Sequence, residues 1–315
     1  MSLRVAVLGA SGFGRHHARW FDALGCDVVA FLGSSPTSVE ATAAALRDAF
    51  PFQGRGYTSL DDLLTAEEPD AVSVCTPPAL HAGHVRAAIG AGCSVLCEKP
   101  FILRPDAPTA DVAAEARRLV AAARERGLVL AVNTQYAAAV EPYRRLAGGL
   151  PACPSRFAAE MTSKLKTPGP RWRGIWLDLM PHTLSMLLGL IPDAVLRAGS
   201  ARGTIEEEES EVEFDVATGD ATCHVWMRVA KLAEAPFPRR FGVDGQVADV
   251  GTRPDAQGAY RGTVRLGDRE AICDDFMKTS IERFCAAVRG EGPPLVDGEA
   301  AVRNLEMMLA LLDAI

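Results

Sequence analysis

Residues 4–14 read Arg-Val-Ala-Val-Leu-Gly-Ala-Ser-Gly-Phe-Gly. The apolar run at residues 5–8 does not alternate with polar residues, which is typical of a strand buried on both faces. The glycines after it predict a tight turn into a helix, whose free N–H groups can face a phosphate. This stretch therefore predicts the first strand, turn and helix of a dinucleotide-binding unit.

The glycine pattern of this turn departs from the ideal fingerprint. Gly-x-Gly-x-x-Gly would place glycines at positions 9, 11 and 14, but Ser11 stands in the middle and Gly12 follows it. A small hydroxyl side chain still lets a pyrophosphate approach the backbone and can itself bond phosphate. We expect the cofactor-binding residues of the turn to be Gly9, Ser11, Gly12, Phe13 and Gly14.

Four more apolar runs follow in the first part of the chain, and helical segments separate them. The runs are residues 28–32, 71–75, 94–97 and 128–132, and the helices are predicted at 12–24, 35–49, 79–91 and 110–126. Such alternation is typical of a parallel sheet with helices on both faces. We expect residues 1–132 to form a doubly wound Rossmann domain of the α/β class.

The second half has a different pattern, because several apolar segments alternate with polar residues. Strands are predicted at 156–161, 194–204, 211–217, 221–229, 240–243, 246–250 and 263–266, and helices at 275–289 and 299–315. We expect residues 133–315 to form an α+β domain with an open-faced mixed, largely antiparallel sheet. An uncovered apolar face on that sheet would favour a homodimer or homotetramer.

Composition excludes several classes of partner. The 315 residues carry 33 basic and 40 acidic side chains, a net charge of −7, which argues against a general nucleic-acid binder. The apolar runs are too short to span a bilayer. The eight cysteines are scattered without a C-x-x-C pair, which indicates buried thiols rather than a zinc site or a disulfide framework. We expect a cytoplasmic protein with a small-molecule partner and no metal.

The end of the second predicted strand bears on the choice of dinucleotide. Rossmann domains selective for NAD place a carboxylate there, which bonds the ribose 2′-hydroxyl. This chain has Gly33, Ser34 and Ser35 instead. A 2′-phosphate is then not repelled, and Ser34 and Ser35 can donate hydrogen bonds to it. The sequence favours NADP over NAD, although Ser35 also suits the N-cap of the next helix.

Two further motifs follow the third and fourth predicted strands, Thr-Pro-Pro-Ala-Leu-His at residues 76–81 and Cys-Glu-Lys-Pro at 97–100. With Gly-Arg-His-His at 14–17, they resemble the glucose–fructose oxidoreductase, inositol dehydrogenase and rhizopine-catabolism (Gfo/Idh/MocA) family, over nearly the whole chain. The resemblance implies an NAD(P)-dependent oxidoreductase that moves a hydride between nicotinamide and a hydroxyl or ketone carbon of a sugar, cyclitol or related polyol. The further cofactor contacts that it implies are Thr76, Pro77, His81 and Glu98.

The family's third motif, an aspartate followed four residues later by a histidine, matches Asp178 and His182. Alcohol oxidation needs a base for the hydroxyl proton, which histidine can supply, and a carboxylate can orient that base. A lysine beside the reacting oxygen stabilises developing alkoxide character. The resemblance thus implies that Lys99, Asp178 and His182 are catalytic. We expect Pro181 at the first position of a helix, with Asp178 preceding it.

Several alternatives remain open at this point. The scaffold also suits a non-catalytic dinucleotide-binding regulator, or a semialdehyde-type reductase with Cys153 as nucleophile. The Asp-x-x-x-His pair also suits a solvated helix face. A basic cluster just before Asp178 is either a solvated loop or a reader of an anionic substrate group. Its members are Lys164, Lys166, Arg171 and Arg173.

Overall fold

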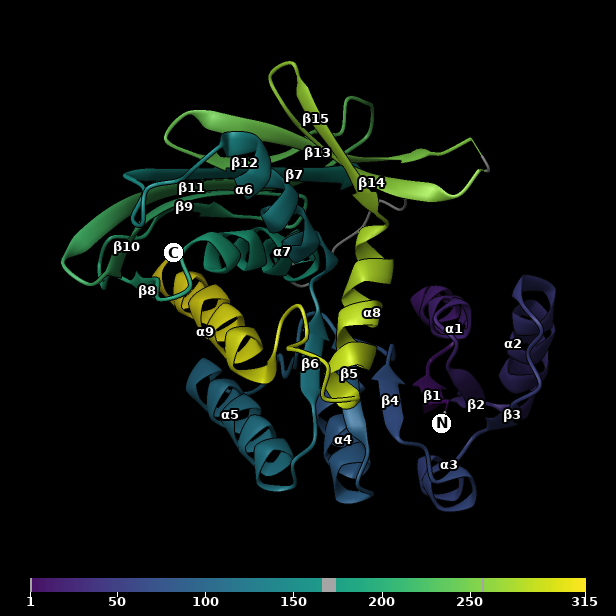
Figure 1. Cartoon of the computed structure of the whole chain (residues 1–315). Coiled ribbons are helices and arrows are strands. Elements are labelled where there is room, and N and C mark those ends of the chain that lie inside the picture. Colours follow the sequence, from purple (N-terminus) through teal and green to yellow (C-terminus); the bar gives the residue numbers. More distant parts are fainter. Residues whose placement is uncertain (1, 166–173, 257) are drawn as a thin grey trace. The chain divides into compact units, whose positions relative to one another are not determined.

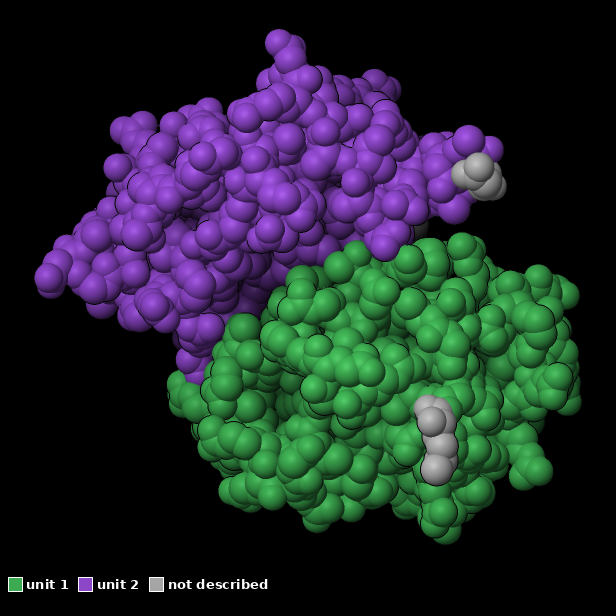
Figure 2. All heavy atoms as spheres, in the orientation of Figure 1, with its two compact units in different colours: residues 1–133, 277–302 green, residues 134–276, 303–315 purple. Residues whose placement is uncertain are grey.

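The structure is a computed structural model that describes residues 2–165, 174–256 and 258–315. The chain divides into two compact units (Figure 2). Unit 1 comprises Met1–Asn133 and Met277–Val302, and unit 2 comprises Thr134–Phe276 and Arg303–Ile315. None of the helices formed by the described residues is long and apolar enough to cross a membrane.

Unit 1 is built on a parallel sheet with the strand order β3-β2-β1-β4-β5-β6 (Figure 1). Its elements are β1 (Arg4–Leu8), α1 (Phe13–Ala23), β2 (Asp27–Leu32), α2 (Pro36–Ala49), β3 (Arg55–Tyr57), α3 (Leu60–Glu67), β4 (Ala71–Val74), α4 (Pro78–Gly90), β5 (Ser94–Glu98), α5 (Thr109–Glu125) and β6 (Leu130–Asn133). The order is that of a Rossmann fold, which confirms the prediction for this part of the chain. It reverses between β1 and β4, where such sheets bind ligands at the carboxyl ends of their strands.

Helix α8 (Phe276–Val288) returns from the second half of the chain and packs in unit 1. Its apolar residues Met277, Ile281 and Phe284 join the core cluster around the first strands, and the Phe284 ring lies edge-on to Phe21 with centroids 6.3 Å apart. Residues 277–302 were expected in the second domain. An apolar helix stripe does not reveal which core it will cover, so the pattern could not show this return.

Unit 2 contains a mixed, largely antiparallel sheet, as predicted. In the described residues its strand order is β15-β14-β13-β12-β7-β11-β10-β8, with β9 paired to β10, and β7 and β11 run parallel. The elements of the second half, besides α8, are η1 (Gln135–Ala139), α6 (Val140–Ala147), β7 (Arg156–Lys164), α7 (Gly174–Leu190), β8 (Val195–Leu196), β9 (Arg202–Ile205), β10 (Glu209–Thr218), β11 (Ala221–Leu232), β12 (Arg239–Val243), β13 (Gln246–Pro254), β14 (Tyr260–Leu266), β15 (Arg269–Asp274) and α9 (Gly298–Ala314).

The sheet of unit 2 has an apolar face and a charged face. Side chains such as Met227 and Phe241 are buried on the apolar face, on which α6 and α7 pack. The opposite face carries a row of alternating charge, with one residue from each of β10, β11, β7, β12, β13, β14 and β15. We call this the charge row: Glu211, Arg228, Glu160, Arg240, Asp249, Arg265 and Glu270. The face opposite α6 and α7 is therefore charged rather than apolar.

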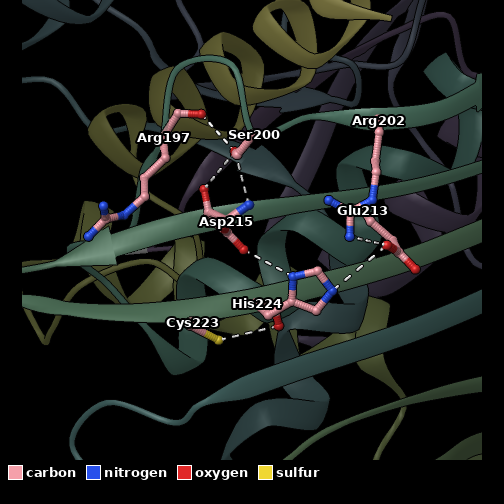
Figure 3. A network of polar contacts seen from close by, with 7 residues as sticks. All are labelled: Arg197, Ser200, Arg202, Glu213, Asp215, Cys223 and His224. Carbon is pink, nitrogen blue, oxygen red and sulfur yellow. Dashed lines mark hydrogen bonds and ion pairs between the residues drawn. The ribbon is translucent and has the colours of Figure 1, made fainter.

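Polar contacts extend along β10 and β11 beside the charge row (Figure 3). The Nδ1 atom of His224 lies 3.0 Å from Oδ1 of Asp215, and Arg202 pairs with Glu213 at 2.6 Å. Because the side chains of a strand alternate between faces, these residues share the face of the charge row. The contact with Asp215 indicates a structural role for His224 in the sheet.

Candidate active site

The loop between β1 and α1 has the geometry of a phosphate cradle. Gly9 has a φ of +84°, and a Cβ there would lie 2.8 Å from a backbone carbonyl oxygen at the end of β4, so a larger residue would be strained. A Cβ on Gly14 would lie 2.5 Å from the carbonyl of Gly9, whereas one on Gly12 would meet nothing within 4 Å. Ser11 and Phe13 are exposed beside this open side. These residues fit a dinucleotide pyrophosphate at the N-terminus of α1.

Packing accounts for the missing acid after β2. A Cβ on Gly33 would lie 2.8 Å from Cγ2 of Val39 on α2, so Val39 occupies the space that a side chain there would need. Ser34 is exposed, and the Ser35 hydroxyl oxygen accepts a hydrogen bond from the backbone N–H of Ser38 at 3.2 Å. Ser35 is thus the N-cap of α2, and its hydroxyl proton can still be donated to a ligand.

The strands β4 and β5 bring the two motifs to one edge of the sheet. β4 ends just before Thr76 and Pro77, and β5 ends at Glu98, just before Lys99. Both strands are parallel neighbours, and β4 also pairs with β1, so their carboxyl ends lie on the same side as the phosphate loop. Every residue of β5 is buried, and Lys99 is the first partly exposed residue after it.

His81 links two turns at this edge. Its Nε2 lies 2.8 Å from the carbonyl oxygen of Thr76, and its Nδ1 lies 3.0 Å from that of Pro100. The ring is fully buried. The resemblance implied a cofactor contact for His81, but both ring nitrogens are engaged with backbone carbonyls. The side chain therefore supports the turns that carry Thr76 and Lys99.

Glu98 also points into the protein. Its Oε1 atom accepts hydrogen bonds from Nε2 of His17 at 2.8 Å and from Nδ2 of Asn133 at 2.6 Å. Burial raises the pKa of Glu98, but the hydrogen bond and charge of His17, with the charge of Lys99, outweigh it and hold the pKa at about 2. Asn133 was not among the residues expected at this site. Its one signal in the sequence was a polar residue at the end of an apolar strand.

In unit 2 the Asp-x-x-x-His motif lies inside α7, which begins at Gly174. Asp178 and His182 are thus one turn apart on the same side of the helix. Pro181 lies within the helix, which corrects the expectation that the helix begins there. Proline cannot donate a backbone hydrogen bond, but α7 is buried along most of its length, and Nδ2 of Asn304 bonds the carbonyl of Pro181 at 2.8 Å.

The surroundings of His182 and Asp178 differ. His182 is 6% exposed, and its ring lies edge-on to Tyr136 with centroids 5.0 Å apart. Asp178 is more open, and its Oδ2 lies 3.1 Å from Nζ of Lys231 at the end of β11. Lys231 follows Met227 and other buried residues on the face of β11 that packs on α7. This contact depends on how α7 packs on β11, so no local motif could have indicated it.

The basic cluster is only partly described. Lys164 is exposed at the end of β7. Lys166, Arg171 and Arg173 lie outside the described residues.

The chain matches known proteins along its length. Residues 3–134 match the model of the Gfo/Idh/MocA family, described as an oxidoreductase family with an NAD-binding Rossmann fold. The chain is 29% identical to UDP-N-acetylglucosamine 3-dehydrogenase of Acidithiobacillus ferrooxidans, over 99% of this chain and 97% of that protein. A solved structure of that dehydrogenase has a TM-score of 0.77 at 26% identity, with 100% of this chain and 98% of that chain covered.

Two further relatives match most of the chain. It is 30% identical to 1,5-anhydro-D-fructose reductase of Ensifer adhaerens, over 83% of this chain and 82% of the reductase. It is 31% identical to dTDP-3,4-didehydro-2,6-dideoxy-alpha-D-glucose 3-reductase of Streptomyces violaceoruber, over 81% of this chain and 79% of that protein. These relatives are named as dehydrogenases or reductases and lend no support to a non-catalytic regulator. The chain belongs to the Gfo/Idh/MocA family and is an NAD(P)-dependent oxidoreductase.

Proposed function

We propose that the enzyme transfers a hydride between nicotinamide and a hydroxyl or ketone carbon of a sugar, cyclitol or related polyol. The observation that carries this proposal is the position of Lys99, which emerges from a buried strand at the carboxyl edge of the Rossmann sheet, on the side of the phosphate loop. In this proposal the residues that touch the cofactor are Gly9, Ser11, Gly12, Phe13, Gly14, Ser34, Ser35, Thr76 and Pro77. Glu98 and His81 act on that site through the turns that they hold.

Side chains of this protein stabilise the charge on the reacting oxygen and transfer its proton. Bound nicotinamide supplies or accepts the hydride. The Lys99 ammonium stabilises the oxygen as it gains alkoxide character. His182 takes the hydroxyl proton during oxidation and returns it during reduction. Asp178, one turn away, favours the charged form of that imidazole.

A nicotinamide-absorbance screen tests the substrate class. The panel contains free sugars, cyclitols, their acids and nucleotide-linked sugars, with the corresponding ketones for the reverse direction and each cofactor in turn. Nucleotide-linked sugars belong in it because two of the relatives carry such sugars in their names. Turnover of at least one polyol or ketone is expected. If folded enzyme that binds cofactor reacts with none of them, the proposed substrate class is wrong.

We further propose that NADP binds at least as tightly as NAD, because no carboxylate follows β2. Gly33→Asp alone would collide with Val39, so the informative variant is Gly33→Asp combined with Val39→Ala. Repulsion of the 2′-phosphate should move the NADP-to-NAD ratio of Kd toward NAD by about tenfold, which corresponds to about 1.4 kcal/mol. Titration of both cofactors measures it, with Val39→Ala as the control. A wild-type preference for NAD would contradict the proposal.

A homodimer or homotetramer through the sheet of unit 2 is also proposed. The charge row supports it, because alternating charges can pair with those of a second copy shifted by one strand. Within one chain, neighbouring charges of the row already form an ion pair, with Nη1 of Arg228 2.6 Å from Oε1 of Glu160. Light scattering should give at least a dimer at low salt and a weaker association at high salt, because such contacts are screened. A monomer at low salt would refute this arrangement.

A further inference from the structure

A buried polar cluster lies under the edge of unit 1 that carries Lys99. We define the His17 network as His17 on α1, Ser73 on β4, Glu98 on β5 and Asn133 on β6. The three strands are neighbours in the sheet, and each of the four residues is 9% exposed or less. We propose that the His17 network is a positioning device that sets the orientation of Lys99. The inference rests on the proposed catalytic role of Lys99.

The contacts of the network converge on one carboxylate. Glu98 Oε1 is held from α1 by His17 Nε2 at 2.8 Å and from β6 by Asn133 Nδ2 at 2.6 Å. The other ring nitrogen of His17, Nδ1, lies 2.9 Å from the Ser73 hydroxyl on β4. The imidazole is thus fixed at both nitrogens, and it in turn fixes the carboxylate from the helix side.

The position of Glu98 directly before Lys99 makes this relevant to catalysis. Successive side chains along a strand point to opposite sides. Holding the Glu98 carboxylate therefore restrains the last peptide of β5 and the direction in which Lys99 leaves it. His17 lies one helical turn after the N-terminus of α1, so the same contacts join the phosphate loop to the end of β5. The network therefore connects the phosphate loop with the end of β5, two parts of the site that must keep fixed positions relative to each other.

Stability alone is a weak reason for this arrangement. The free energy needed to remove two charges from water offsets much of the attraction between them. Apolar replacements of such buried pairs are therefore often neutral or stabilising. Burial lowers the pKa of His17, but Cys75 and Glu98 outweigh it and raise that pKa above its ordinary value. The pKa of Glu98 is lowered at the same time, so the two shifts both favour the charged forms of the pair. A geometric role accounts for a charged pair at this place.

Glu98→Gln tests the role, because it keeps the shape and one carbonyl acceptor but removes the charge. We expect kcat to fall by about 10- to 100-fold, the size of effect that a misplacement of about 1 Å can have. The Kd of the cofactor should change by less than about threefold, since the carboxylate touches protein groups. In a Lys99→Met background the same change should cost almost nothing further, because the network acts through that lysine.

Asn133→Ala provides a second variant in case Glu98→Gln does not fold. It removes one donor, leaves the ion pair with His17, and should show the same dependence on Lys99. Glu115→Gln is the matched control, since Glu115 is another buried carboxylate of unit 1, held by Arg86 and Arg104. Its kcat should match the wild type.

The outcomes distinguish a failure of the positioning role from a failure of the proposed function. If Glu98→Gln or Asn133→Ala lowers kcat by the same factor with and without Lys99, the network does not act through the lysine and the positioning role is wrong. The positioning role is also wrong if both variants retain wild-type kcat. If Lys99→Met itself turns over normally, the proposed role of Lys99 fails instead.

Discussion

Lys99→Met will lower kcat by about 10²–10³-fold, the usual cost of removing a group that stabilises charge in the transition state. Methionine keeps a long unbranched side chain without the ammonium, so the fall in kcat measures the contribution of the positive charge of Lys99. Lys99 is partly exposed after a wholly buried strand, and its replacement should leave the sheet intact. Because the ammonium acts on the reacting oxygen, the Kd of the cofactor should stay within about threefold. Steady-state kinetics and cofactor titration on the same preparation measure both quantities.

The control is Lys99→Arg, which keeps a positive charge at the same position. It should recover part of the lost rate, because its guanidinium is larger and aims its donors differently. A Lys99→Met enzyme with wild-type kcat would remove this residue from the mechanism. The proposed function would then need another group at the carboxyl edge of the sheet.

The parallel sheet could be predicted well from the sequence, because strands buried on both faces leave apolar runs without alternation. The prediction missed β3, which has only three residues, of which Arg55 and Gly56 are exposed. Such an edge strand buries too little surface to leave a pattern. The short helix α3 was missed as well, although Ser59 caps it.

The second half shows how turns divide apolar segments. Residues 194–204 were expected to form one strand, but the structure has β8 and β9 on either side of a turn. Gly199 has a φ of +72° there, and the Ser200 hydroxyl bonds the carbonyl of Arg197 at 2.7 Å. Glycine and serine allow this conformation without a local signal strong enough to end a strand.

The motifs were enough to place Lys99 at the carboxyl edge of the sheet, whereas the contacts of Glu98 beneath it could not be predicted. Glu-Lys-Pro after a strand points to Lys99, because ligands of such sheets bind at that edge. The partners of Glu98 come from α1 and β6, at positions 17 and 133. Only the packing of α1 on the sheet and the pairing of β6 with β5 bring such distant residues together. For the same reason no motif indicated that Lys231 pairs with Asp178.

His182→Ala will lower the rate of alcohol oxidation by about 10²–10⁴-fold, the usual contribution of a general base. It should also flatten the limb of the pH profile along which oxidation rises with pH. His182 is buried against Tyr136, so alanine leaves a cavity and reduces stability as well. His182→Gln fills much of that space without a titrating group. If the imidazole is the base, both variants lose the limb, whatever their melting temperatures.

Removing the charge of Asp178 or that of Lys231 gives a sharper test, because the two changes should move the midpoint of the pH limb in opposite directions. Asp178→Asn removes a negative charge that favours the imidazolium, so the midpoint of the limb should move to lower pH. Lys231→Met removes the positive charge 3.1 Å from Asp178, so the midpoint should move to higher pH. Adding Asp178→Asn to His182→Ala should cost little more, because groups that act as one unit are not additive. If Asp178 and Lys231 only hold α7 against β11, each variant loses stability and the midpoint stays in place. In that case another group assists the base, and Asp178 stabilises the packing of α7 without taking part in proton transfer.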